Sequence, residues 1–243
     1  MALLNNRVAL VTGGSRGIGR AIAISLAEAG AGVAVNYRAR EAEARHVVEG
    51  IRGSGCRAMA VRADVSQAAD VAAMMAAVER ELGRVDVLVN NAGVGPVRTL
   101  DELTEADFDL TIAVNLKSVF LCTQAVLPGM RARQWGRIVN ISSGAARGAG
   151  GVGPHYNASK AGMEGMTRGY AARLVKDGIT VNAVAPSLIE TDMVRGGVAA
   201  SPARIPLGRF GTPEECAQVV MMLVGNAYMT GQTVALSGGL SFL

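Results

Sequence analysis

The sequence predicts a single doubly wound α/β domain of Rossmann type, with about seven parallel strands and helices on both faces of the sheet. Short, continuously apolar runs alternate with helix-compatible segments along the chain, as is typical of parallel strands buried on both faces. A glycine-rich turn joins the first such run to the first helix. The 243 residues show no internal repeat or linker, so one domain, 1–243, is expected.

Each element is justified by local signals. Gly30 and Gly178 end two of the helical patterns, and Thr212-Pro213-Glu214-Glu215 supplies an N-cap, a proline at the first helical position and a returning glutamate. Pro128 is expected to mark the end of the fourth helix. The strands are predicted at 7–12, 33–37, 59–62, 85–90, 137–142, 180–185 and 234–236. The helices are predicted at 17–29, 41–52, 67–82, 104–130, 156–176 and from 212 onward.

Composition argues against several classes of protein. The net charge is +4, and no dense Lys/Arg cluster with interleaved aromatic residues is present, so nucleic-acid binding is not expected. Three separated cysteines do not form a secreted disulfide framework, and the two histidines lack metal-ligand spacing. His155 is instead expected to line the entrance of a pocket. No signal peptide and no apolar stretch of membrane-spanning length is expected, which predicts a cytoplasmic protein without a metal site.

The glycine-rich turn has the sequence Thr-Gly-Gly-Ser-Arg-Gly-Ile-Gly over 12–19. Because it leads from a strand into a helix, its free amides and the helix dipole favour a pyrophosphate. Gly13 permits the turn, Gly17 close approach of the ligand and Gly19 close packing, while Ser15, Arg16 and Ile18 are expected to contact the cofactor. The alternative is a purely structural turn.

The end of the second predicted strand indicates which dinucleotide binds. NAD-binding proteins place an acid there to hold the ribose hydroxyls, but this chain has Asn36-Tyr37-Arg38. Arg16 and Arg38 could flank a 2′-phosphate, since guanidinium groups pair well with phosphate oxygens. NADP(H) is therefore predicted. The alternatives are two solvated arginines, or Glu41 as a weak competitor that binds the ribose.

Two further segments end strands at the edge where such sheets bind ligands. Asp64 could accept the adenine amino group and Val65 could offer its backbone, unless Asp64 only caps the helix after Ser66. In Asn90-Asn91-Ala92-Gly93, Asn90 is expected to brace neighbouring loops, while the small Ala92 and Gly93 admit the cofactor ribose.

Tyr156 and Lys160 lie four residues apart, which places both side chains on one face of a helix. A phenol titrates near 10, so proton exchange at neutral pH requires its anion to be favoured by about 3 pH units, roughly 4 kcal/mol. A fixed ammonium group supplies part of this. The alternative is a pair of side chains that merely share a surface.

These motifs together resemble the short-chain dehydrogenase/reductase family over essentially the whole chain. The shared features are TGxxxGxG, NNAG, a mid-chain asparagine, a serine thirteen residues before the tyrosine, and YxxxK. The resemblance implies that Tyr156 is the general acid and that Lys160 lowers its pKa and holds ribose hydroxyls. It also implies that Ser143 orients the substrate carbonyl and that Asn115 bends its helix and holds a water in a proton relay.

The resemblance extends past the sixth strand. It implies that Pro186 borders the cofactor, that Ile189 offers its backbone to the carboxamide, and that Thr191 contacts the nicotinamide or pyrophosphate, with a helix-cap role as the alternative. The irregular segment 187–211 is expected to be a substrate lid. Two residues depart from the family pattern. Ser187 stands where glycine is usual, which bears on the conformation at the start of this lid and on the shape of the pocket, and Ser237 stands where aspartate is usual, at a structural corner.

Within the family, the chain is similar to reductases of 3-oxoacyl thioesters carried on acyl carrier protein or CoA. A broader carbonyl or secondary-alcohol oxidoreductase and an inactive cofactor-binding scaffold are the alternatives. The resemblance implies a homotetramer built through 116–127, the Tyr156 helix and the C-terminal strand. A positive surface for the thioester's phosphorylated arm or its acidic carrier could come from Arg131, Arg133, Arg137, Arg173 and Lys176, against ordinary solvated charges as the alternative.

Overall fold

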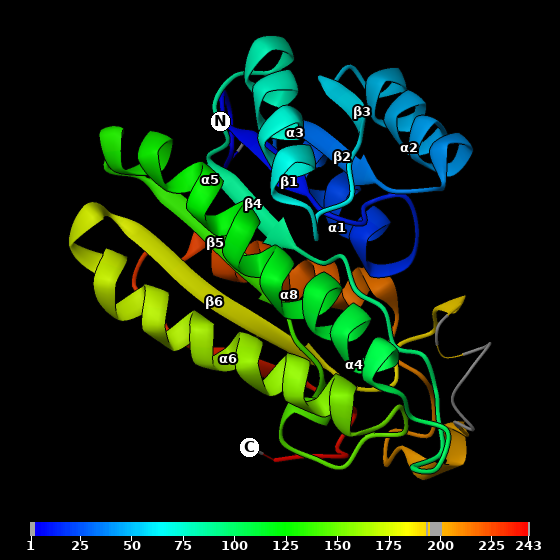
Figure 1. Cartoon of the computed structure of the whole chain (residues 1–243). Helices are drawn as coiled ribbons and strands as arrows, with labels where there is room; N and C mark the ends of the chain where they lie inside the picture. Colours follow the sequence, from blue (N-terminus) through cyan, green and yellow to red (C-terminus); the bar gives the residue numbers. More distant parts are fainter. Residues whose placement is uncertain (1–2, 193, 195–200, 243) are drawn as a thin grey trace.

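The computed structural model describes residues 3–192, 194 and 201–242, and its centre is a seven-stranded parallel sheet (Figure 1). The strand order is β3-β2-β1-β4-β5-β6-β7, with each strand paired in parallel to its neighbours. The predicted doubly wound fold is confirmed. The strands are β1 (Val8–Val11), β2 (Gly32–Tyr37), β3 (Ala58–Arg62), β4 (Val87–Asn90), β5 (Gly136–Ile141), β6 (Ile179–Pro186) and β7 (Thr233–Leu236).

Helices cover both faces of the sheet (Figure 1). One face packs against α1 (Gly17–Glu28), α2 (Glu41–Gly53) and α8 (Pro213–Gly225). The other packs against α3 (Ala68–Glu81), α5 (Ser118–Ala132) and α6 (Pro154–Leu174). Shorter helical pieces are α4 (Glu105–Ile112), η1 (Ala113–Lys117), η2 (Gly144–Ala146), η3 (Val175–Asp177) and η4 (Pro202–Arg204).

Strand alternation divides the core into two apolar layers. Along β2, Val33 and Val35 belong to the layer under α1 and α2, whereas Ala34 belongs to the layer under α3 and α5. All six residues of β2 are buried, as expected for a central parallel strand. Cys122 lies in the second of these layers and Cys216 is buried in α8; burial raises the pKa of each thiol to about 12, which disfavours the reactive thiolate.

The fourth helical region differs from its prediction. Pro128 lies inside α5, which continues to Ala132, because the burial of Leu127 and Met130 against the sheet favours a further turn of helix. Upstream, five residues around Asn115 form a π-helical turn between α4 and α5. Such turns widen the helix locally and occur frequently at functional sites.

The continuous helical stretch Glu105–Ala132 also corrects the expectation that no segment has membrane-spanning length. Its 28 residues are long and apolar enough to cross a bilayer, by length and composition alone. Half of its most apolar window is buried inside the protein, and core helices of soluble proteins pass the same test. It is therefore weak evidence for a membrane span.

Helix starts follow the local signals closely. Thr104 and Thr212 each form a capping box, in which the threonine hydroxyl accepts from the third helical amide and that residue's carboxylate accepts from the threonine amide. Arg209 donates to both carboxylate oxygens of Glu215, at 3.0 and 2.7 Å, and this hydrogen bond lowers the pKa of Glu215 to about 2. The end of the lid segment is thereby joined to α8.

Gly178 connects α6 to β6 with φ +69°, and a β-carbon there would overlap the Gln134 carbonyl oxygen. Replacement by alanine adds left-handed strain and a clash with backbone, so Gly178→Ala should lower the free energy of unfolding by at least about 2 kcal/mol. Gly165→Ala is the matched control, since nothing lies within 4 Å of its β-carbon position inside α6, and it should stabilise by about 1 kcal/mol. Urea unfolding of both variants measures this; equal effects would contradict it.

Candidate active site

A cavity of about 660 Å³ opens at the carboxyl edge of the sheet, where β1 and β4 lie side by side and the strand order reverses. It is lined by every residue that the sequence predicted to bind cofactor, and by Ser143, Tyr156 and Lys160. Asn115 lies behind this lining. The fold therefore gathers residues from the ends of six strands, β1 to β6, and from helix α6 at one site.

The glycine turn is held by side chains from two neighbouring strands. The Asn36 Oδ1 atom accepts from the Gly13 amide at 3.2 Å, and Asn91 Nδ2 donates to the carbonyl oxygens of Thr12 and Gly13 at 2.9 and 3.0 Å. Gly13 has φ +61°, and a β-carbon on Gly19 would overlap the Gly13 carbonyl oxygen. Both glycines are thus required by the turn's conformation and packing.

Asn90 was expected to brace neighbouring loops. Its side chain instead contacts the neighbouring strand β5, where Nδ2 donates to Asn140 Oδ1 at 2.8 Å. Bracing of the glycine turn falls instead to Asn91, which is half-buried at the end of β4. Strand alternation explains the exchange of roles, because adjacent residues at a strand end point to opposite sides.

The turn fits a dinucleotide cofactor. In α1 the first backbone bond runs from the Arg20 amide to the Arg16 carbonyl, at 3.1 Å. The amides of Gly17, Ile18 and Gly19 have no protein acceptor among the described residues, and they open toward the cavity at the positive end of the helix dipole. This arrangement suits an anion such as a pyrophosphate, with Ser15 and Ile18 beside it.

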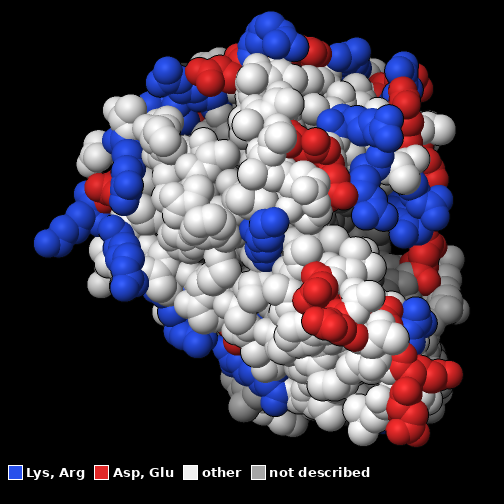
Figure 2. All heavy atoms as spheres, in the orientation of Figure 1, with Lys and Arg blue, Asp and Glu red and all other residues white. Residues whose placement is uncertain are grey.

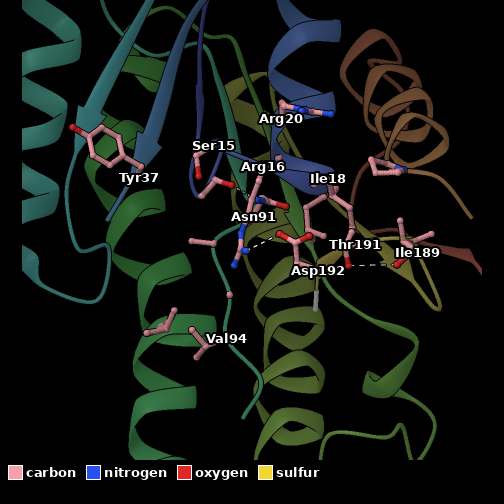
Figure 3. Close-up of a pocket in the computed structure, with 18 of the residues that line it drawn as sticks. Ser15, Arg16, Ile18, Arg20, Tyr37, Asn91, Val94, Ile189, Thr191 and Asp192 are labelled. Carbon is pink, nitrogen blue, oxygen red and sulfur yellow. Dashed lines mark hydrogen bonds and ion pairs between the residues drawn. The ribbon is translucent and has the colours of Figure 1, made fainter. Parts of the chain in front are cut away.

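The two arginines predicted to bind a 2′-phosphate both line the cavity, and each faces a carboxylate. Arg16 Nη1 donates to Asp192 Oδ2 at 2.7 Å, and Arg38 Nη1 lies 3.8 Å from Asp64 Oδ2. Figure 3 shows Arg16 on the glycine turn facing Asp192, which follows Thr191. Sequence reasoning missed Asp192, and also Arg20 and Arg40, which complete a group of four arginines around this part of the cavity.

Asp64 forms the local turn that one of its two alternatives described, and it also lines the cavity. Its Oδ1 atom accepts from the amide and hydroxyl of Ser66, at 3.0 and 2.7 Å, so it closes a local turn ahead of α3. Burial raises the pKa of this carboxyl, but the Ser66 hydrogen bonds and the charge of Arg38 outweigh burial and leave the pKa below its ordinary value. Asp64, Val65 and Tyr37 still line the cavity, where an adenosine group would lie.

The Tyr156 and Lys160 side chains share a face of α6, and Lys160 Nζ lies 5.7 Å from the centre of the tyrosine ring. Both side chains are buried, and Lys160 Nζ donates to the Ile141 carbonyl oxygen at 2.8 Å. Ser143 follows the end of β5 and hydrogen-bonds to Tyr156. Adjacent Ser142 points to the other side, as alternation predicts, and donates to Glu164.

Burial controls the titration of both groups in the protein alone. It raises the pKa of Tyr156 above 10, and the hydrogen bond with Ser143 offsets only part of that increase. Burial also lowers the pKa of Lys160 from 10.5 to about 8. Tyr156 is therefore protonated at neutral pH, as a proton donor must be, and Lys160 remains largely charged.

The lowered pKa of Lys160 predicts that the free energy of unfolding depends on pH. Between about pH 8 and 10.5 the unfolded chain binds a proton at this lysine that the folded chain does not, so stability rises with pH across that window. Between pH 8 and 10.5, the free energy of unfolding of the cofactor-free wild type should rise by at most about 3 kcal/mol relative to that of Lys160→Met. Urea unfolding at both pH values measures the difference; parallel stability curves for the two proteins would contradict the buried ammonium.

Asn115 is fully buried in the π-helical turn and holds the loop after β4. Its Oδ1 accepts from the Val94 amide at 2.8 Å, and its Nδ2 donates to the Val94 carbonyl and to Ser159 Oγ, at 2.9 and 3.1 Å. These contacts place Asn115 between Gly93 and the Lys160 helix. A β-carbon on Gly93 would lie 3.4 Å from Asn115 Oδ1 and 3.6 Å from Lys160 Nζ.

The segment after β6 forms the opposite wall. Pro186 and Ile189 line the cavity, and Thr191 lies against Gly17, whose β-carbon position is 3.4 Å from the Thr191 methyl group. Ser187 also lines the cavity, with its hydroxyl packed against Gly144. A bridge between Ile189 and Gly211 closes the base of the predicted lid, while Gly196, Gly197 and their neighbours lie outside the described residues. Ser237 closes a turn by accepting from the Ser241 amide at 3.2 Å.

Two other predicted positions, His155 and Arg137, differ in the structure. His155 does not line the cavity; it is buried, with Nε2 3.1 Å from the Pro96 carbonyl oxygen. Arg137 is buried too and donates to the carbonyl groups of Gly136, Gly178 and Val224, so it cannot join a surface patch. Among the described residues, no group of His, Cys, Asp or Glu is arranged to hold a metal ion.

A buried ion pair beside the site was not predicted. Glu164 lies one turn beyond Lys160 on α6, with its side chain 5% exposed, and accepts from Arg147 Nε at 2.9 Å and from Ser142 Oγ at 3.2 Å. It thereby joins α6 to the loop that carries Ser143. The only sequence signal was an acidic residue at helical spacing from Tyr156 and Lys160. Acidic residues with that spacing are common on the solvent-exposed faces of helices.

Comparison with known proteins identifies the family. A family model described as short chain dehydrogenase matches residues 7–200. The chain is 43% identical to the 3-oxoacyl-[acyl-carrier-protein] reductase FabG of Staphylococcus epidermidis, over 97% of this chain and 99% of that protein. It is 41% identical to a (2S)-[(R)-hydroxy(phenyl)methyl]succinyl-CoA dehydrogenase subunit, BbsD, of Thauera aromatica, over 98% of each.

A solved structure agrees in fold. The crystal structure of a putative gluconate dehydrogenase from Agrobacterium tumefaciens covers 100% of both chains, with a TM-score of 0.93 and 34% sequence identity. The described sheet, the glycine turn and the Ser143, Tyr156 and Lys160 side chains at one cavity agree with these matches. The chain belongs to the short-chain dehydrogenase family.

Proposed function

We propose that the protein is an NADPH-dependent reductase that converts a 3-oxoacyl thioester into the 3-hydroxyacyl thioester. The observation that carries this proposal is the meeting of Ser143, Tyr156 and Lys160 in the same cavity as a glycine turn with free amides. Similarity to 3-oxoacyl-[acyl-carrier-protein] reductases over nearly the whole chain supports the substrate class.

In the proposed reaction, the bound nicotinamide cofactor supplies a hydride to the substrate's carbonyl carbon. Tyr156 donates its phenolic proton to the carbonyl oxygen, which becomes the hydroxyl. The Ser143 hydroxyl donates a hydrogen bond to that oxygen while negative charge develops on it. Lys160 places a positive charge beside the phenolate that forms, and Asn115 supports the return of a proton from solvent to Tyr156.

NADPH is preferred over NADH in this proposal because the end of β2 presents no carboxylate to the ribose. Asn36 at that place is committed to the glycine turn, whereas Arg16 and Arg38 border the cavity. A 2′-phosphate would pair with their guanidinium groups. The same residues would leave a ribose 2′-hydroxyl without the acceptor that NAD-binding proteins provide.

In this proposal the thioester arm lies outside the described cavity. The arm belongs to acyl carrier protein, and CoA is the alternative carrier. The positive surface once expected for it is reduced, because Arg137 is buried and Arg131 is paired with Asp177 at 2.8 Å. Arg173 is exposed but lines the apolar groove that a second copy of the chain is proposed below to cover, and Lys176 remains exposed. We place the reaction in the cytoplasm, where an acyl carrier or CoA thioester would be met.

A broader carbonyl or secondary-alcohol oxidoreductase is the second candidate. Relatives of similar identity are named for chemically different substrates, an aryl-substituted succinyl-CoA and a gluconate. The four proposed catalytic residues would serve any of these substrates equally. Ser187 and the lid segment would then decide which carbonyl compound fits.

We also propose a homotetramer. An apolar groove across the helices is lined by Ile112, Leu116, Phe120, Met166 and Tyr170, and Phe120 is 47% exposed. Figure 2 shows few charges over the surface of α5 and α6. A second copy of this chain would cover that face, with the exposed Leu240 near the C-terminus contributing to another contact. Sedimentation showing only monomer at micromolar concentration would refute this assembly.

The proposed function is tested by following NADPH oxidation with acetoacetyl-CoA, beside NADH and a simple aromatic ketone. Turnover that is faster with NADPH and the thioester supports the proposal. Activity only with the ketone would favour the broader oxidoreductase. Activity only with NADH would remove the roles given to Arg16 and Arg38.

A further inference from the structure

The Arg16–Asp192 ion pair spans the rim of the cavity between two segments that are far apart in the sequence. Arg16 precedes α1 on the glycine turn, and Asp192 lies in the segment after β6. Nη1 of the arginine and Oδ2 of the aspartate are 2.7 Å apart, and Figure 3 shows the two side chains facing each other. The Thr191 methyl group lies 3.4 Å from the β-carbon position of Gly17, so the two segments also meet beside this pair.

This pair engages Arg16, one of the two arginines that the proposed function assigns to the 2′-phosphate. The Arg16 and Asp192 side chains are 50% and 64% exposed, so water solvates both partners and the pair is weak. A phosphate dianion accepts stronger, bidentate hydrogen bonds from a guanidinium group than a single carboxylate oxygen does. A 2′-phosphate would therefore displace Asp192, whereas the uncharged 2′-hydroxyl of NADH would not.

We propose that Asp192 is a specificity-determining residue that competes with the 2′-phosphate of NADPH for Arg16. NADPH releases Asp192 from the glycine turn, and NADH leaves the ion pair intact. The inference rests on the proposed cofactor preference. Arg38 is held less tightly than Arg16, because its partner Asp64 lies 3.8 Å away and also accepts a hydrogen bond from Ser66.

Linkage gives the competition a measurable sign. Binding of the phosphate breaks the Arg16–Asp192 ion pair, so the free energy of that pair opposes NADPH binding. Removing the carboxylate should therefore strengthen NADPH binding. NADH leaves the Arg16–Asp192 ion pair intact, so the affinity for NADH should not change when the carboxylate is removed. The opposite possibility is that the pair remains closed over any bound dinucleotide, in which case removing the carboxylate weakens both.

The test is the dissociation constant of NADPH and of NADH for wild type, Asp192→Asn, Arg16→Ala and the double variant, by titration calorimetry at low salt. Asp192→Asn should bind NADPH about two- to fivefold more tightly and NADH unchanged. In the Arg16→Ala background the same substitution should change NADPH binding by less than about twofold. Asp192→Glu, which keeps the charge, and Glu79→Gln, which breaks a distant exposed pair with Arg84, should both match wild type.

Unchanged NADPH binding in Asp192→Asn, or weaker binding of both dinucleotides, would overturn the inference and leave the NADPH preference standing. If Asp192→Asn still tightened NADPH binding in the Arg16→Ala background, the inference would also be overturned, because a general effect of charge would then be responsible. Wild-type protein that binds NADPH no more tightly than NADH, with no loss in Arg16→Ala, would overturn the proposed cofactor preference together with the inference.

Discussion

Replacement of Tyr156 by phenylalanine should reduce kcat for carbonyl reduction by roughly 10²- to 10⁴-fold. The substitution removes only the phenolic oxygen, and the ring would keep its packing against Val152 and Ala145. The proton that must reach the carbonyl oxygen then has no donor at that position. Dinucleotide binding should be nearly unchanged, because the glycine turn, Asn36 and Asn91 do not depend on the phenol.

Steady-state kinetics and a cofactor titration on the same Tyr156→Phe preparation measure both parts of this prediction. Tyr170→Phe is the control, since Tyr170 also lies on α6 but its hydroxyl accepts from Gln124 at the surface. That variant should retain wild-type turnover. A Tyr156→Phe protein with unchanged kcat would show that the acid is another group and would return the inactive-scaffold and alternative-site hypotheses to consideration.

Replacement of Arg147 by alanine should lower the free energy of unfolding by about 3 kcal/mol. Glu164 is buried, and without the guanidinium group its carboxylate would keep only the hydrogen bond from Ser142 among the described contacts. Water cannot replace the lost partner freely, because the Glu164 side chain is only 5% exposed. The desolvated charge, more than the lost contact, causes the penalty.

Arg45→Ala is the matched control for this second prediction. It breaks an ion pair with Glu41 that is shorter, at 2.6 Å, but both of its side chains are more than half exposed, so the cost should stay below about 0.5 kcal/mol. Adding Glu164→Gln to Arg147→Ala should recover part of the loss, since the buried charge is then gone. Equal costs for the two arginines in urea unfolding would show that the Arg147 pair behaves as a surface pair.

The fold and much of the site could be predicted because their signals are local. Apolar runs indicated the strands, and capping residues such as Thr212 indicated helix starts. The order of glycines at 13, 17 and 19 indicated a turn that only small residues can form. Likewise, the four-residue spacing of Tyr156 and Lys160 is sufficient to place both on one face of α6.

The parts that could not be predicted depend on distant contacts. Arg16 and Asp192 are 176 positions apart, and nothing local distinguishes Asp192 from other acids that could meet an arginine. Arg137 was expected on the surface because charge usually indicates exposure. It is buried because three backbone carbonyl groups accept from it and its guanidinium carbon lies 4.5 Å from the centre of the Trp135 ring.

Pro128 and the π-helical turn show the same limit within one helix. Proline usually ends a helix, but burial of its neighbours outweighs one missing hydrogen bond. A bend at Asn115 was implied only by the family resemblance, because the widened turn has no local sequence signal. It is fixed by the contacts of the Asn115 carboxamide with Val94 and Ser159, which only the folded chain brings together.

The most direct test of the central proposal is the fate of the transferred hydrogen. Acetoacetyl-CoA is incubated with wild-type protein and NADPH that carries deuterium on the transferable position of nicotinamide C4, and the products are examined by mass spectrometry. We expect 3-hydroxybutyryl-CoA with deuterium at C3, formed in equal amount to the NADPH consumed and lost in Tyr156→Phe. Unreacted thioester in a preparation that reduces an aromatic ketone, or label that appears with Tyr156→Phe at the wild-type rate, would contradict it.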